Sequence, residues 1–191
     1  MANNELLTII PTITAIRDSG NEQFDNKKYD EAIMLYENGL NYSTSFVYKN
    51  KGKISKEDVN EINLLKKEML SKMAQCFFNL NEYEKSIEID KGIISIDACY
   101  DEAYSRLFYA NMKLNLPYVA VEYGNNIFKH CDDSIKEKYK DIKEQVERIE
   151  KERKEKQDKE FKEKYNDKLY KMILPMLVGA IAGAIFYLYK K

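Results

Sequence analysis

Between residues 135 and 149, hydrophobic residues recur at spacings of four and three residues, the pattern of one helix face. The residues of this stripe are Ile135, Tyr139, Ile142, Val146 and Ile149. After Ile149 the stripe stops, and from Glu150 to Glu160 almost every side chain is charged, with Glu and Lys at the i, i+4 spacing of a solvated helix. The pattern predicts a helix that caps a core and continues over 150–171 as an exposed, charged stalk.

The chain then changes character over 172–189, where about 18 residues follow one another without a charge. Such a run is long enough to cross a bilayer core of about 30 Å. Lysines bracket it and could reach the two headgroup layers: Lys168, Lys171, Lys190 and Lys191. A buried core helix is the alternative interpretation. We predict a tail anchor, inserted after synthesis, that leaves the preceding chain on the cytosolic side.

Two further expectations concern this anchor. Gly179 and Gly183 form a small-xxx-small pair through which two such helices could approach closely, so weak self-association is one interpretation. The run is short, diluted by Gly and Ala, and flanked by lysines on both sides, which favours the mitochondrial outer membrane. The endoplasmic reticulum membrane is the alternative.

The sequence before the cap contains three similar segments, which cover 20–40, 73–87 and 104–120. Tyr83 and Pro117 are separated by 34 residues, and so are Ser86 and Ala120. The first and second segments lie about 20 residues further apart, and we assign this excess to 42–61. There, Ser43-Thr44-Ser45 and 49–53 are predicted to be loop, and Ser55 to be a helix N-cap.

These segments resemble the tetratricopeptide repeat, a helical hairpin with a period of 34 residues. In this family small residues stand where the paired helices cross, which assigns that role to Gly20, Ala32 and Gly39. The resemblance implies an all-α fold of three helical hairpins, followed by a long capping and stalk helix and one transmembrane helix. The predicted domains are a repeat domain over 1–149, the stalk over 150–171 and the anchor over 172–189.

Composition excludes several classes of function. The net charge of −1 gives no basic field for nucleic acid. Cys76, Cys99 and Cys131 are scattered and odd in number, which favours reduced thiols over a disulfide framework or a zinc site. With His130 the single histidine and no phosphate-binding loop or nucleophile elbow, we expect no enzyme activity, no cofactor and no metal.

The family resemblance also implies a binding site. The chain is similar to the co-chaperone repeat domain of the large immunophilins, without the isomerase module, in which a carboxylate clamp grips the acidic C-terminal tail of cytosolic heat-shock chaperones. Residues of the motif fall on Arg17, Asn21, Lys72 and Arg106. Lys72 stands where the family has an asparagine. Glu102 stands where it has a lysine, and would repel the carboxylates of such a tail unless Lys72 or Arg106 neutralises it.

The sequence therefore predicts a membrane-anchored adaptor whose groove binds a chaperone tail and recruits it to an organelle. The alternative is a protein-import or fission receptor that reads an amphipathic helix through apolar contacts. The polarity of the groove discriminates between the two.

Overall fold

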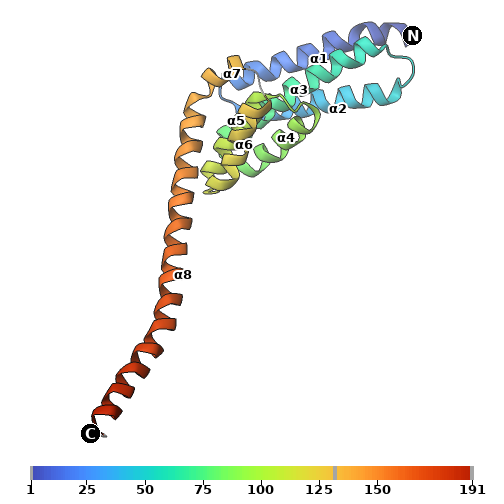
Figure 1. Ribbon diagram of the computed structural model, residues 1–191. Coiled ribbons are helices and arrows are strands. Elements are labelled where there is room, and N and C mark those ends of the chain that lie inside the picture. The colour runs from blue at the N-terminus through green and yellow to red at the C-terminus, as the bar shows by residue number, and fades with distance from the viewer. Residues whose placement is uncertain (1, 131–132, 190–191) are drawn as a thin grey trace. The chain divides into compact units, whose positions relative to one another are not determined.

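The computed structural model describes residues 2–130 and 133–189, with the side chains of 8–129, 135 and 137–175. Within this part of the chain every regular element is an α-helix (Figure 1). In chain order they are α1 (Ala2–Asp25), α2 (Tyr29–Lys49), α3 (Lys56–Asn79), α4 (Tyr83–Ile96), α5 (Asp101–Lys113), α6 (Pro117–His130), α7 (Asp133–Lys138) and α8 (Lys140–Tyr189). The all-α prediction is confirmed for these residues.

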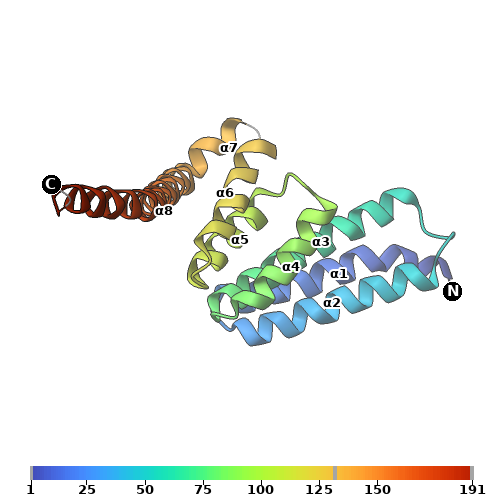
Figure 2. The ribbon, with the colours of Figure 1, turned by 60° about the horizontal axis from the view of Figure 1, so that its bottom comes forward.

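The chain divides into two compact units, Met1–Val146 and Glu147–Lys191. In the first unit, α1 packs on α2, α3 on α4 and α5 on α6, and these hairpins stack through α2 on α3 and α4 on α5 (Figure 2). The first helices of the hairpins, α1, α3 and α5, are also neighbours. Three stacked hairpins with their first helices on one face is the arrangement that the repeat pattern predicts.

The three hairpin turns share one backbone conformation. Lys27, Asn81 and Asn115 each adopt a left-handed conformation, with φ values of 60°, 63° and 59°. The next residue in each turn donates its N–H to a carbonyl five residues earlier, at 2.8 to 2.9 Å, which is the closing bond of a Schellman motif. Lys27 and Asn81 are 54 residues apart, and Asn81 and Asn115 are 34 apart. The turns therefore confirm both the period and the extra 20 residues.

The extra residues lengthen two helices, and here the sequence prediction was partly wrong. Ser43-Thr44-Ser45, predicted as loop, lies inside α2, where the buried Ser43 hydroxyl donates to the Leu40 carbonyl at 2.9 Å. Phe46, one turn further, is buried in the same core and holds this part of α2 in place. The predicted N-cap is confirmed, because the Ser55 hydroxyl accepts the N–H of Asp58 at 3.0 Å.

Small residues stand at close contacts between helices, as predicted. A Cβ at Gly20 would lie 2.5 Å from the ring of Tyr36, and one at Gly39 would lie 2.6 Å from the sulfur of Met69. Ala32 is fully buried. These contacts confirm that Gly20 and Gly39 cannot carry a larger side chain without a shift of the core.

The capping stripe is buried on the side of the third hairpin. Tyr139, Ile142 and Val146 are buried, and Ile142 and Val146 both lie against the position where a Cβ of Gly124 on α6 would stand. Ile135, the first residue of the stripe, is partly buried, and Ile149 belongs to the second unit, where it is buried as well. The apolar stripe therefore does in the structure what its spacing predicts.

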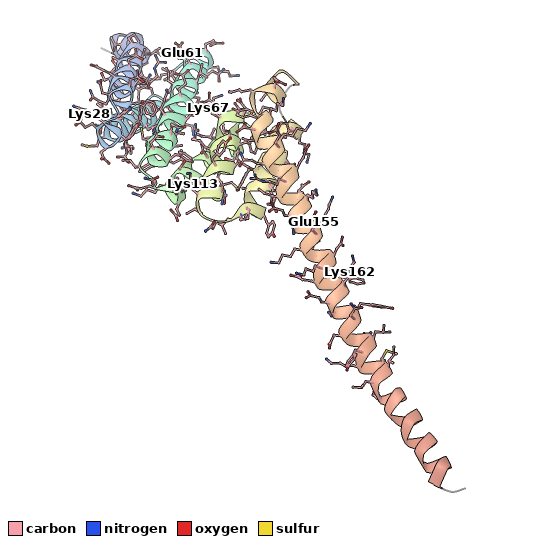
Figure 3. All side chains as sticks on the ribbon, turned by 90° about the vertical axis from the view of Figure 1, so that its left-hand side faces the viewer. Lys28, Glu61, Lys67, Lys113, Glu155 and Lys162 are labelled. Carbon is pink, nitrogen blue, oxygen red and sulfur yellow. The ribbon has the colours of Figure 1, made fainter. Side chains whose placement is uncertain are left out.

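In the second unit α8 continues as one helix to Tyr189, and every side chain described from Lys151 onward is exposed. Glu155 and Lys162 project from the helix on Figure 3. Among the described residues, no helix is long and apolar enough to cross a membrane. Most of the predicted anchor, from Met176 onward, lies outside the residues whose side chains are described, and so do Gly179 and Gly183. Tail anchoring and self-association therefore stay predictions.

Candidate functional site

A pocket of about 410 Å³ opens between α1, α3 and α5, and we call it the polar groove. All four residues of the predicted site line it, Arg17 and Asn21 from α1, Lys72 from α3 and Arg106 from α5, together with Glu102. Its other lining residues are Glu68, Ser71, Gln75, Tyr100, Ser105, Lys138 and Tyr139. The side chains that line the groove are therefore mostly polar or charged.

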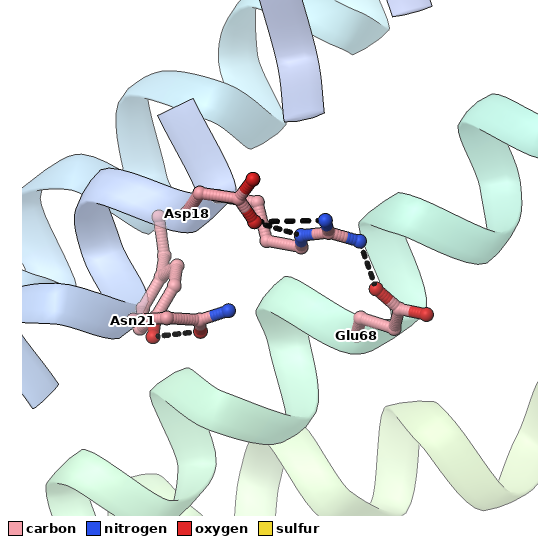
Figure 4. A network of polar contacts seen from close by, with 5 residues as sticks. Asp18, Asn21 and Glu68 are labelled. Carbon is pink, nitrogen blue, oxygen red and sulfur yellow. Dashed lines mark hydrogen bonds and ion pairs between the residues drawn. The ribbon is translucent and has the colours of Figure 1, made fainter. Parts of the chain in front are cut away.

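Arg17 is held by two carboxylates of the chain itself (Figure 4). Its Nε and Nη2 donate to Asp18 at 2.9 and 2.8 Å, and its Nη1 donates to Glu68 on α3 at 2.7 Å. Burial acts to lower the pKa of Arg17, but the hydrogen bonds and charges of Glu68 and Asp18 outweigh it and raise the pKa. A ligand carboxylate at Arg17 must therefore share or displace Glu68.

A core residue holds the Asn21 side chain in place. Its Oδ1 accepts the hydroxyl of the fully buried Tyr36 at 2.8 Å (Figure 4). The amide oxygen thus accepts a bond from the protein itself, and the two N–H donors of the amide are available to a ligand. The close approach of Gly20 to Tyr36 fixes the ring that makes this bond.

Arg106 is buried, which the sequence did not predict. Its Nε and Nη2 donate to the carboxylate of Asp90 on α4, with a shortest distance of 2.8 Å, and Nη2 also donates to Ser71 on α3 at 2.9 Å. One guanidinium thus joins α3, α4 and α5. With Nε and Nη2 occupied, Nη1 is the part of the Arg106 guanidinium that remains for a ligand.

Asp90 is fully buried beneath the groove. Burial raises the pKa of this carboxyl to about 6, even though the hydrogen bonds and charge of Arg106 act to lower it. Sequence reasoning missed Asp90, although a signal existed: Ser86, Asp90 and Ile93 follow the helical spacing of a buried face. A carboxylate on such a face requires a partner, and Arg106 is that partner.

Lys72 and Glu102 are both exposed on the groove. The ammonium of Lys72 lies 4.5 Å from the centre of the Phe24 ring, a cation–π contact. Glu102 accepts the Tyr100 hydroxyl at a long 3.4 Å. No ion pair of the described residues includes Lys72 or Glu102.

Lys138 brings the end of α7 to the rim of the groove. It pairs with Asp101, the first residue of α5, at 2.9 Å, and the Tyr139 hydroxyl donates to the same carboxylate at 2.9 Å. Burial acts to raise the pKa of Asp101, but the bonds from Lys138 and Tyr139 outweigh it and lower the pKa. Nothing in the local sequence links positions so far apart, so this contact was not predicted.

Other candidate chemistry is sparse in the part of the chain that the structure describes. Cys76 is a buried cysteine and Cys99 an exposed one, while Cys131 and the His130 side chain lie outside the described residues. Burial raises the pKa of the Cys76 thiol to about 12. Among the described residues no cluster of His, Cys, Asp or Glu side chains could hold a metal ion.

No protein-family model and no curated protein sequence matches the chain. Solved structures do. The C-terminal tetratricopeptide-repeat (TPR) domain of a Plasmodium falciparum protein described as FK506-binding matches with a TM-score of 0.61 and 20% identity, over 78% of this chain and 93% of that domain. The second TPR of Spaghetti (RPAP3), bound to the HSP90 peptide SRMEEVD, matches with a TM-score of 0.47 and 17% identity, over 67% of this chain and 96% of that one. The first similarity shows that this chain has a TPR-like fold.

Proposed function

We propose that the polar groove binds a peptide segment that carries a carboxylate, and that the protein is a non-enzymatic adaptor. The observation that carries this proposal is the convergence of Arg17, Asn21, Lys72 and Arg106, from three different hairpins, on one groove. Arginine, lysine and amide donors are the groups that form charge-assisted hydrogen bonds with a carboxylate. The polar lining supports this reading over an apolar trough for an amphipathic helix.

The ligand that the family resemblance favours is the acidic C-terminal tail of a cytosolic heat-shock chaperone. The charges of this groove moderate the expected affinity. Glu68 competes for Arg17, Asp90 occupies most of Arg106, and Glu102 faces the ligand with a like charge. We therefore expect micromolar rather than nanomolar binding.

Fluorescence anisotropy with the full-length chain in a nonionic detergent tests this function. A labelled peptide ending in Val-Asp should bind, and amidation of its C-terminus should weaken binding by roughly tenfold or more, because a charge-assisted bond is worth about 1.5 to 3 kcal/mol. Lys72→Ala and Asn21→Ala should weaken binding as well. Lys113→Ala, which changes an exposed lysine outside the groove (Figure 3), is the matched control. Equal affinity for the acid and the amide would refute the proposal.

The proposal also includes the membrane. The apolar run 172–189 would anchor the adaptor with its groove in the cytosol, and its short length and flanking lysines favour the mitochondrial outer membrane over the endoplasmic reticulum. Alkaline carbonate extraction of cell membranes tests the anchoring, and microscopy with markers for both organelles tests the location. Recovery of the full-length chain in the supernatant would refute the anchor.

One observation supports the alternative, a receptor for an amphipathic helix. A second hollow, of about 590 Å³, lies between α3 and α4 and is lined by Leu64, Leu70, Ile93 and Ile96 together with polar residues at its rim. Leu64 is 52% exposed and Ile96 is 80% exposed, so apolar surface is available there. Binding of a helical peptide that Leu64→Ser abolishes, and Lys72→Ala leaves unchanged, would establish this second function.

A further inference from the structure

Most charges of the polar groove already have an opposite charge within the protein. Arg17 pairs with Asp18 and Glu68, at 2.8 and 2.7 Å. Arg106 pairs with Asp90 at 2.8 Å, and Lys138 pairs with Asp101 at 2.9 Å. A net count of lysines and arginines therefore overstates the attraction of this groove for an anion.

Two charged side chains of the groove lining, Lys72 and Glu102, have no such opposite charge among the described residues. Lys72, on α3, rests on the Phe24 ring and forms no ion pair with a described residue. Glu102, on α5, has the Tyr100 hydroxyl as its hydrogen-bond donor, and it too forms no ion pair with a described residue. Both side chains are exposed on the groove. The groove thus offers a ligand one cation and one anion.

From this arrangement we infer that the groove selects a peptide segment with one acidic group and one basic group, and that Glu102 is the residue that selects the basic one. The acidic group is the carboxylate that the proposed function assigns to Lys72 and Asn21, so the inference rests on that function. The basic group is a lysine or arginine side chain of the same peptide, bound by Glu102.

The physical reason is the cost of covering a charge. A ligand that fills the groove removes water from Lys72 and Glu102 together, and each charge then requires a partner. A wholly acidic peptide satisfies Lys72 but brings a like charge to Glu102, and such juxtapositions reject the wrong ligand. A peptide with both signs of charge satisfies both residues.

The test is a set of matched peptides measured by anisotropy against the full-length chain in detergent. All have the same length and a free C-terminal carboxylate, and they differ at one position, which carries Lys, norleucine or Glu. The substituted position is moved stepwise away from the C-terminus. This scan finds the distance along the peptide at which its C-terminal carboxylate reaches Lys72 while its basic side chain reaches Glu102. At the best position we expect the Lys peptide to bind about tenfold tighter than the norleucine peptide, and the Glu peptide to bind weakest.

Variants then assign this preference to one residue. Glu102→Gln should remove the difference between the Lys and norleucine peptides, and Glu102→Lys should reverse the order so that the Glu peptide binds best. Glu88→Gln changes an exposed carboxylate of α4 outside the groove and should leave the order unchanged.

The outcomes separate the two claims. If the peptides bind in a carboxylate-dependent way but show no preference for Lys at any position, the inference is overturned and the proposed function stands. A preference that survives in Glu102→Gln overturns it equally. If no peptide binds, the proposed function fails and the inference fails with it.

Discussion

At the scale of single residues, the buried pair of Asp90 and Arg106 has the largest expected effect on stability. Arg106→Ala would leave the fully buried Asp90 carboxylate without its partner, and such a loss costs about 3 to 5 kcal/mol. Chemical denaturation followed by circular dichroism measures this free energy of unfolding. Lys113→Ala, at an exposed position of the same helix, should change it by no more than about 0.5 kcal/mol.

A double variant distinguishes an unpaired charge from lost packing. Asp90→Leu combined with Arg106→Met removes both charges and retains volume, so it should recover much of the loss, as replacement of a buried pair by apolar residues often does. A double variant that is as unstable as Arg106→Ala would show that packing, and not the unpaired carboxylate, determines the loss.

Gly20 provides a second test at this scale. Alanine is the better helix former by about 1 kcal/mol, yet its Cβ at position 20 would lie 2.5 Å from the ring of the fully buried Tyr36. Because overpacking costs about 1 to 3 kcal/mol, Gly20→Ala should be less stable than the wild type. Gly92→Ala has nothing within 4 Å and should be more stable by up to about 1 kcal/mol. Equal effects of the two changes would contradict the predicted helix crossing.

At the scale of elements, Asp101 joins the start of α5 to the end of α7. The pKa of Asp101 is lower in the folded protein than in the unfolded chain, where it is about 3.9. The ionised carboxylate therefore contributes stability above that unfolded-state pKa, and this stability is lost as the pH falls through the lower pKa of the folded state. Asp101→Asn should therefore be less stable than the wild type at pH 7, by about 1 to 2 kcal/mol. The two proteins should become equally stable in acid.

Denaturation curves at several pH values measure this difference. Asp58→Asn is a suitable control, since Asp58 forms none of the ion pairs of the described residues. A deficit of Asp101→Asn that persists unchanged in acid would show that the bonds to Lys138 and Tyr139 do not depend on the charge.

At the scale of the whole molecule, the two units predict how the chain responds to truncation. The compact unit ends at Val146, and the described side chains from Lys151 to Pro175 are exposed. Deletion of 172–191 should therefore leave the thermal unfolding midpoint of the helical domain unchanged while it releases the protein from membranes. Aggregation or a lower midpoint on deletion would indicate that 172–189 is a core helix, the alternative interpretation of this run.

Much of the fold was predicted from local patterns. The period of 34 residues follows from comparing one hairpin with the next, while the small residues at Gly20 and Gly39, the N-cap at Ser55 and the stripe that ends at Ile149 are signals within one helix or one hairpin. Such signals act over a few residues, so a sequence displays them directly. The exception was 43–45, where serine and threonine favour a loop but the burial of Phe46 keeps the helix continuous.

Part of the groove lining was also predicted, because the repeat pattern brings the first helices of the hairpins to one face and the family resemblance indicated five of the lining residues. The electrostatic state of the groove did not. Arg17 meets Glu68 across 51 positions, Arg106 meets Asp90 across 16 and Ser71 across 35, and Lys138 meets Asp101 across 37. Local patterns carry no information about contacts that only the stacking of hairpins creates. The sequence by itself determined that the first helices of the hairpins share one face; the tertiary structure decided which further residues line the groove, which of its charges are already neutralised and which remain for a ligand.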